Sequence, residues 1–119
     1  MKYLNTLSLI ITLISIANAD SWQQKNSLPS VTRAAAFAFS IGNKGYVGGG
    51  LNFLSGGAQQ DFWQYDPATN TWTQKADLGG GVRSAAVAFS NGGKGYALTG
   101  SSNTQKENDI WEYDTLANQ

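Results

Sequence analysis

The chain has 119 residues, with 8 basic and 8 acidic side chains and neither cysteine nor histidine. Without these two residue types it can form no disulfide, no thiolate or imidazole metal site, and no Cys–His or Ser–His catalytic pair. The balanced charge gives no long-range attraction to nucleic acid or to an anionic membrane, so neither partner is predicted. No cofactor is predicted.

The first 19 residues have the pattern of a secretory signal peptide. Lys2 precedes an apolar run over Leu4–Ile16, and Ala17-Asn18-Ala19 has the small-x-small form that signal peptidase requires. A membrane span needs roughly 20 apolar residues, so this run is too short for one. We expect cleavage after Ala19 and a secreted, periplasmic or cell-surface protein comprising residues 20–119, with 7 basic and 8 acidic side chains and a net charge of −1.

An internal repeat dominates the remaining sequence. Residues 22–50 and 72–100 align with 15 identities in 29 positions. Farther on, the motif D-F-W-Q-Y-D at Asp61–Asp66 recurs as D-I-W-E-Y-D at Asp109–Asp114. The spacing changes by two residues within the Gly/Ser/Asn-rich loops 51–60 and 101–108, where insertions are best tolerated. A period near 50 residues is that of a propeller blade.

Each unit is predicted to contain four strands. In the first unit they cover residues 34–40, which are small and apolar on both faces, then 45–49, 62–65 and 71–75. Residues 66–70, with the sequence Asp-Pro-Ala-Thr-Asn, form the turn between the last two strands, because proline fixes φ and Asp or Asn bonds the local backbone.

The combined motifs resemble those of Kelch-repeat proteins, which are β-propellers. The resemblance rests on an arginine, an apolar strand, an aromatic-x-Gly-Gly strand, a Tyr-Asp-Pro turn and a downstream tryptophan. Besides Arg33 and Pro67 of the first unit and Arg83 and Gly100 of the second, the repeat residues that carry it are Tyr46, Gly49, Gly50, Tyr65, Asp66, Trp72, Tyr96, Tyr113 and Asp114. The second unit departs at Ala97-Leu98-Thr99, which lacks the glycine pair, and at Thr115, which replaces the proline.

The resemblance implies an all-β fold of about two four-stranded antiparallel Kelch blades in an incomplete ring. Residues 1–19 are the signal peptide, 20–32 a linker with the end strand of a preceding blade at 22–25, 33–76 a blade, and 77–119 an incomplete blade. Since a propeller closes with about 4 to 8 blades, we expect a truncated propeller. The alternative is that several copies assemble into one ring.

Four residues are candidates for ligand binding. Arg33 and Arg83 occupy equivalent positions before the innermost strand, and arginines at that position in Kelch modules often bind acidic peptides. Their repetition favours a framework role instead. Phe53 and Leu54 are apolar loop residues without a counterpart in the second unit, so they are the other contact candidates. The repeated tryptophans and tyrosines are better explained by packing between blades than by carbohydrate stacking.

The leading hypothesis is a secreted Kelch-repeat module that binds a protein or another ligand, with a protein or carbohydrate partner. Two alternatives remain open. The chain could be a non-catalytic part of a Kelch-type enzyme, similar to galactose oxidase or to sialic-acid epimerase, or a self-assembling lectin-like propeller. We predict no catalytic residue and no metal site in this chain.

Overall fold

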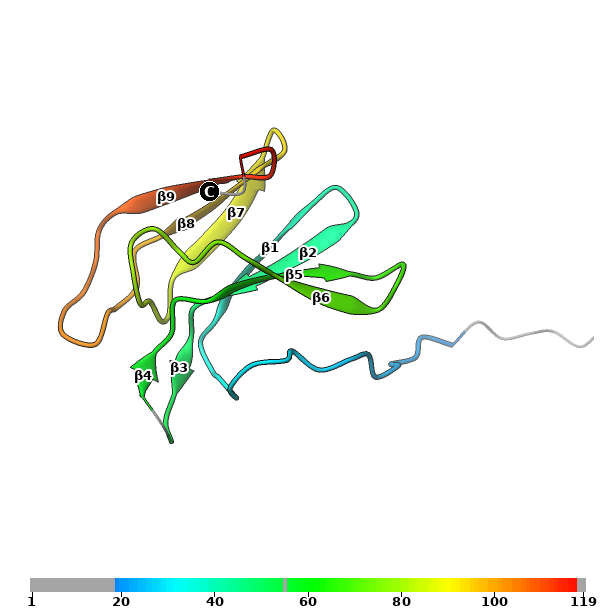
Figure 1. Ribbon diagram of the computed structural model, residues 1–119, viewed down its shortest axis with the longest axis horizontal. Coiled ribbons are helices and arrows are strands. Elements are labelled where there is room, and N and C mark those ends of the chain that lie inside the picture. Colours follow the sequence, from blue (N-terminus) through cyan, green and yellow to red (C-terminus); the bar gives the residue numbers. More distant parts are fainter. Residues whose placement is uncertain (1–18, 55, 118–119) are drawn as a thin grey trace, which may run out of the picture.

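The computed structural model describes residues 19–54 and 56–117, and all regular structure in these ranges is β. The predicted signal peptide, apart from its last residue, Ala19, lies outside the described residues. Two antiparallel sheets lie side by side, and a short two-stranded hairpin projects from one end of the first sheet (Figure 1). No helix within the described ranges is long and apolar enough to cross a membrane. The all-β prediction is confirmed for this part of the chain.

The first sheet is a complete four-stranded blade. Its strands, in spatial order, are β1 (Phe37–Ile41), β2 (Lys44–Gly48), β5 (Phe62–Asp66) and β6 (Thr71–Lys75), each antiparallel to its neighbour. The β5–β6 turn places Asn70 at a φ of 54°, a left-handed conformation that asparagine tolerates better than most residues. The four strands predicted for the first unit are confirmed, with small shifts at their ends.

The first strand begins three residues later than predicted. We expected it at Ala34, but Ala35 takes a φ of 53° and interrupts the extended backbone, so that Ala34 forms only an isolated bridge with Leu51. Ala85 has the same φ of 53° in the second unit. A left-handed alanine costs backbone free energy, so its occurrence at both equivalent positions marks a bend that the blade geometry requires.

The loop after β2 contains structure that the sequence did not predict. Its residues form β3 (Leu51–Asn52) and β4 (Gly57–Ala58), which pair as a small antiparallel hairpin. The side chain of Asn52 is buried and donates a hydrogen bond from Nδ2 to the carbonyl oxygen of Thr32, at 2.7 Å. The hairpin is therefore attached to the segment that leads into the blade.

The second sheet has three strands, β7 (Val87–Asn91), β8 (Lys94–Leu98) and β9 (Ile110–Asp114). Its register repeats that of the first blade: Phe89 faces Tyr96 across β7 and β8, as Phe39 faces Tyr46 across β1 and β2. In the part of the chain that the structure describes, no fourth strand pairs with β9. The two sheets therefore form one complete and one incomplete blade, and they do not close a ring.

The hydrophobic core lies between the two sheets. Its buried residues come from β1, β2 and β5 of the first sheet and from β8 and β9 of the second: Phe37, Tyr46, Phe62, Ala97 and Tyr113. The rings of Phe62 and Tyr113 meet edge to face with centroids 4.8 Å apart. Aromatic pairs of this kind contribute about 0.5–1.5 kcal/mol each beyond the area that they bury. Tyr46 and Tyr113 thus contribute their rings to the core between the blades, with centroids 5.5 Å apart.

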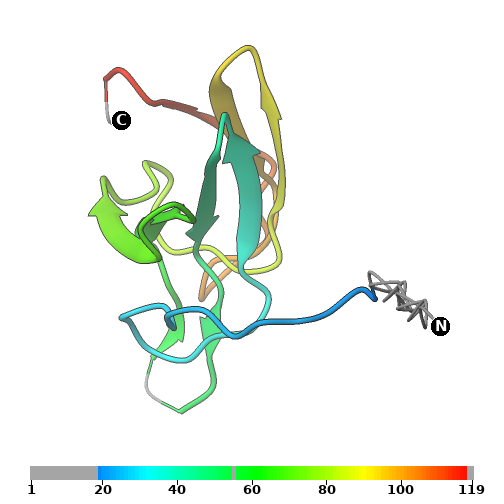
Figure 2. The same cartoon turned by 90° about the vertical axis from the view of Figure 1, so that its right-hand side faces the viewer.

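One close approach fixes how the sheets meet. The ring of Phe39 lies so near Gly95 that a Cβ atom at Gly95 would overlap it. Figure 2 shows β1 of the first sheet beside the strands of the second. Because Gly95 has no side chain, the Phe39 ring of the first sheet packs directly against the backbone of β8. This contact determines the position in which the second sheet docks.

Residues 20–32 do not form the strand that we expected at 22–25. Among the described residues no strand pairs with that segment, and Trp22 is fully exposed. The segment is attached to the first blade farther on, where the backbone N–H of Asn26 donates to Oδ1 of Asn70 at 2.9 Å and Nε1 of Trp72 donates to the carbonyl oxygen of Asn26 at 2.9 Å. The assignment of residues 22–25 to a further blade stays a prediction.

Candidate binding site

Both candidate arginines are held by an aspartate of their own blade. In the first blade, Nη1 of Arg33 lies 2.7 Å from Oδ1 of Asp61, and Nη2 lies 2.7 Å from Oδ2. In the second blade, Arg83 binds Asp109 in the same two-point manner, at 2.6 and 2.9 Å. This fork-to-fork geometry is the strongest arrangement available to a guanidinium and a carboxylate.

The same arginines also bind backbone carbonyls. Nη1 of Arg33 donates to the carbonyl oxygen of Gly49 at 2.9 Å, and Nη1 of Arg83 donates to that of Thr99 at 2.8 Å. Their side chains are only 6% and 2% exposed. The arginines therefore connect the end of the second strand of each blade to the aspartate before the third strand, and their role in ligand binding stays a prediction.

The surroundings of the two aspartates favour the charged form. Burial opposes ionisation of Asp61, but hydrogen bonds from Arg33, Trp63 and Ser30 outweigh it and lower its pKa to about 2. The pKa of Asp109 is also lowered to about 2, chiefly by its hydrogen bonds with Arg83. Both carboxylates therefore stay ionised at any pH at which the fold is expected to persist, so neither is suited to exchange a proton in catalysis.

Trp63 and Trp111 complete the two arginine–aspartate pairs. Nε1 of Trp63 donates to Oδ2 of Asp61, and Nε1 of Trp111 donates to Oδ2 of Asp109, each at 2.7 Å. Sequence analysis recognised these tryptophans as repeated but did not find Asp61 and Asp109 as partners of the arginines. Both aspartates recur at the start of the D-F-W-Q-Y-D and D-I-W-E-Y-D motifs, but the alignment of the two units does not show which residue each one binds.

The other two candidates, Phe53 and Leu54, lie at the tip of the β3–β4 hairpin. Their side chains are 79% and 90% exposed. The backbone beneath them is ordered, because the N–H of Leu54 donates to Oδ1 of Asn52 at 2.8 Å and the N–H of Ala58 donates to Oδ1 of Asn103 at 2.7 Å. Two large apolar side chains are thus presented to solvent on a hairpin that is held at its base.

A hollow of about 260 Å³ lies beside this tip and brings three of the four candidates together. Arg33, Phe53 and Leu54 all line it, while Arg83 does not. The rest of its wall is formed by Thr32, Ala34 and Leu51. Among the residues that line the hollow Arg33 alone is charged, and because Asp61 neutralises its guanidinium the hollow offers mainly apolar contact.

Asn103 is a contact that the sequence did not reveal. It belongs to the loop between β8 and β9, and its Oδ1 atom accepts the hydrogen bond from Ala58 on the hairpin of the preceding blade. A Cβ atom at Gly57 would overlap the Asn103 side chain, so the two loops approach closely. A lone asparagine in a Ser/Asn-rich loop carries no distinguishing signal in the sequence, which is why this contact was missed.

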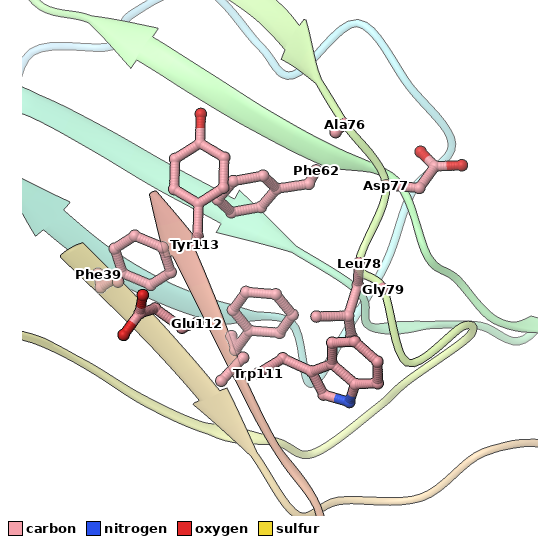
Figure 3. Close-up of a pocket in the computed structure, with 12 residues that line it drawn as sticks. Phe39, Phe62, Ala76, Asp77, Leu78, Gly79, Trp111, Glu112 and Tyr113 are labelled. Atoms are coloured by element: carbon pink, nitrogen blue, oxygen red, sulfur yellow. The ribbon is translucent and has the colours of Figure 1, made fainter. Parts of the chain in front are cut away.

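A larger cavity of about 410 Å³ lies between the two sheets. Phe39, Phe62, Leu78, Trp111 and Tyr113 are among its lining residues, and Figure 3 shows these side chains around the open space. It lies beside β9, where the sheet has no further strand. Among the described residues no group of three or more His, Cys, Asp or Glu side chains could hold a metal ion, in this cavity or elsewhere.

Two packed antiparallel blades, each with the same arginine–aspartate pair, define a protein of the β-propeller class. Residues 32–79, which contain the first blade, match the family model of the Kelch motif. The solved structure of YjhT, a Kelch-type propeller, is similar with a TM-score of 0.70 and 19% sequence identity. The match covers 87% of this chain and 41% of the YjhT chain, so this chain spans less than half of that one. A comparison with curated proteins found no match.

Proposed function

We propose that the chain acts as an exported Kelch-type propeller module that binds a protein partner through the tip of the β3–β4 hairpin. One observation carries the proposal: Phe53 and Leu54 are 79% and 90% exposed on a hairpin whose base is held by Asn52. Apolar side chains on ordered loops are typical contact residues, because little conformational entropy is lost when a partner covers them.

The chemistry of the hollow beside the tip supports a protein ligand over a carbohydrate. Its lining is mainly aliphatic and aromatic, and the guanidinium of Arg33, one of the lining residues, is already bound to Asp61. A sugar requires many hydrogen-bonding groups around its hydroxyls, whereas an apolar side chain of a partner needs only a dry pocket. We infer that the partner inserts one apolar side chain beside Phe53 and Leu54.

The proposal is tested by selecting peptides from a random phage-displayed library on the immobilised protein. The double variant Phe53→Ser/Leu54→Ser should lose the selected binders. Leu116→Ser serves as the matched control, because Leu116 is 96% exposed in the turn after β9. Binding that survives the double variant, or binding only to a glycan array, would contradict the proposal.

Export is tested separately. The chain is produced with its first 19 residues in a secreting host, and the N-terminus of the recovered protein is sequenced. We expect Asp20 as the first residue. Retention of residues 1–19 on a protein that stays inside the cell would contradict export, and it would leave the peptide-binding result unaffected.

A further inference from the structure

Each blade has two different faces, and the contact between the sheets uses one face of each. The first sheet contributes what we call its ring face, with Phe37, Phe39, Tyr46 and Phe62. The second sheet contributes what we call its groove face, with Ala88, Gly95, Ala97 and Tyr113. Because the blades are repeats, each sheet also carries the other kind of face on its opposite side.

The ring face of the second blade is exposed. The repeat places Val87, Phe89 and Ile110 where the first blade has Phe37, Phe39 and Phe62. Phe37 and Phe62 are 4% and 3% exposed, whereas Val87, Phe89 and Ile110 are 61%, 46% and 58% exposed. Three neighbouring apolar side chains on one sheet face are a surface that soluble proteins normally cover.

The groove face of the first blade has open space at the position that would receive the exposed ring face of a second blade. Gly45 is the repeat equivalent of Gly95. A Cβ atom at Gly95 would overlap the Phe39 ring, whereas a Cβ at Gly45 would have only Cβ of Tyr65 within 4 Å, at 3.9 Å. The chain thus carries an exposed Phe89 ring on one side and open space at Gly45 on the other, and their repeat equivalents, Phe39 and Gly95, already fit each other within the chain.

The edge of β9 and residues 22–25 are complementary as well. β6 completes the first blade with the sequence Trp72-Thr73-Gln74-Lys75, and the exposed segment has the sequence Trp22-Gln23-Gln24-Lys25. Trp22 stands 50 residues before Trp72, which is the length of one repeat. Residues 22–25 are therefore the repeat equivalent of the strand that β9 lacks.

The cavity between the sheets is lined by the repeat equivalents of residues that contact Trp72 in the first blade. In the first blade, the ring of Trp72 packs on Tyr65 with centroids 4.9 Å apart, and its Nε1 donates to the carbonyl oxygen of Asn26. The equivalents of Tyr65 and Asn26 in the second unit are Tyr113 and Ala76. Both line the 410 Å³ cavity of Figure 3, where no tryptophan occupies the equivalent place.

We propose that a second copy of this chain docks head to tail on the second blade and completes it. Residues 22–25 of the second copy pair with β9, with Trp22 opposite Tyr113 and Lys25 opposite Ile110, in the register that Trp72 and Lys75 have with Tyr65 and Phe62. Trp22 fills the cavity, and the groove at Gly45 of the second copy receives Phe89.

Such a contact is heterologous, so it repeats until a ring closes. With two blades per copy, closure at about 4 to 8 blades requires about two to four copies.

Thr99 lies at a close approach within the proposed contact between the two copies. It stands where Gly49 closely approaches the carbonyl oxygen of Arg83, and a Cβ at Gly49 would overlap that oxygen. In the docked assembly, the Cβ of Thr99 faces the equivalent carbonyl oxygen, that of Arg33 in the second copy. The variant Thr99→Gly should therefore strengthen association, which a contact elsewhere on the molecule would not predict.

The pairing of strands is tested by crosslinking between two variants. The chain has no cysteine of its own, so Gln23→Cys and Glu112→Cys, which face each other in the proposed register, each introduce a single thiol. When the two proteins are mixed and oxidised, we expect a mixed disulfide dimer. Thr104→Cys, in the exposed loop between β8 and β9, replaces Glu112→Cys in the control mixture and should give much less dimer with Gln23→Cys.

The docking of the faces is tested by the mass of the purified chain in light scattering over a range of concentrations. We expect a discrete oligomer whose dissociation constant rises at least about tenfold in Phe89→Ser, in Trp22→Ser and in Gly45→Val. Phe53→Ser, which removes an even more exposed phenylalanine from the hairpin tip, is the matched control and should leave the oligomer unchanged.

Three results would overturn the proposal. A chain that is monomeric at all concentrations would mean that a segment of a longer polypeptide covers the ring face of the second blade. An oligomer that persists in all three variants would place the contact elsewhere. A Gln23→Cys/Glu112→Cys double variant that crosslinks at the mass of one chain would mean that the segment completes the blade of its own copy. Binding of peptides at the hairpin tip is unaffected by any of these outcomes.

Discussion

Arg83 and Asp109 form a two-point ion pair inside the second blade, with Nη1 and Oδ1 2.6 Å apart, and the pair reproduces that of Arg33 and Asp61 in the first. Both arginines are almost fully buried, and each also binds the carbonyl at the end of the second strand. A buried guanidinium without its carboxylate would be a large cost to the fold. Substitutions in these two pairs are therefore expected to lower the stability of the blades more than substitutions elsewhere.

The first prediction concerns removal of the charge of Asp61. Asp61→Asn should lower the free energy of unfolding by about 2–3 kcal/mol, because it leaves the buried Arg33 unpaired. Asp109→Asn should cost less, since Asp109 is 36% exposed and water screens its charge. Asp77→Asn removes an exposed aspartate as the control and should change stability by no more than about 0.5 kcal/mol. Urea unfolding followed by tryptophan fluorescence measures all three, and equal effects of Asp61→Asn and Asp77→Asn would refute the prediction.

The second prediction concerns acid. Asp61 and Asp109 have pKa values lowered from 3.8 to about 2, so the folded state binds fewer protons at these groups than the unfolded state. Their contribution to stability is complete above pH about 4 and is lost as the pH falls through about 2. Unfolding in urea at a series of pH values should show this decline, and the decline should be shallower in Asp61→Asn. An unchanged slope in that variant would mean that other carboxylates cause the acid sensitivity.

The third prediction concerns two equivalent backbone positions. Gly49 has a φ of 60° and Thr99 a φ of 59°, so the second blade holds a β-branched residue in a left-handed conformation. Thr99→Gly should relieve this strain and raise the free energy of unfolding by about 1 kcal/mol. Gly49→Ala should lower it, because the new Cβ would overlap the carbonyl oxygen of Arg83. Thermal unfolding of the dilute protein measures both, and destabilisation by Thr99→Gly would show that its side chain makes a contact worth more than the strain.

The fourth prediction concerns the fit of Phe39 into β8. Gly95→Ala should destabilise the dilute protein by about 1–3 kcal/mol, because the methyl group must displace the partly buried Phe39 ring. Gly45→Ala, at the equivalent position of the first blade, should change stability little, since the methyl group enters open space beside Tyr65. Denaturant unfolding at low protein concentration compares the two variants. A similar loss in both would mean that glycine is needed in the strand itself rather than at the contact.

The sequence predicted the strands well because their signals are local. Alternating aromatic residues in β5 and the turn at Asp66–Asn70 define the outer half of the first blade, and the structure confirms both. The bend at Ala35 escaped prediction, since alanine has no intrinsic preference for a left-handed φ and only the surrounding blade imposes it. Propensity describes a residue by itself, and here the tertiary structure overrides it.

The candidate site was predicted only in part, for a related reason. Phe53 and Leu54 could be chosen because they interrupt the repeat, and a break in a repeat is visible in the sequence. The pairing of Arg33 with Asp61 and the contact of Asn103 with Ala58 join residues 28 and 45 positions apart. Contacts at that separation are determined by how the strands are arranged, which an alignment of the two units does not contain.

The two blades are also joined through main-chain atoms. The N–H of Gly50 donates to the carbonyl oxygen of Arg83 at 2.7 Å, that of Arg83 to Gln59 at 2.8 Å, and that of Ala85 to Ala35 at 2.9 Å. Every residue type except proline supplies these donors. Mutational drift can therefore change most side chains of a blade while its alignment with the next blade persists. A gene that duplicates such a unit gains a blade that already fits its neighbour, and selection is left free to diversify the loops.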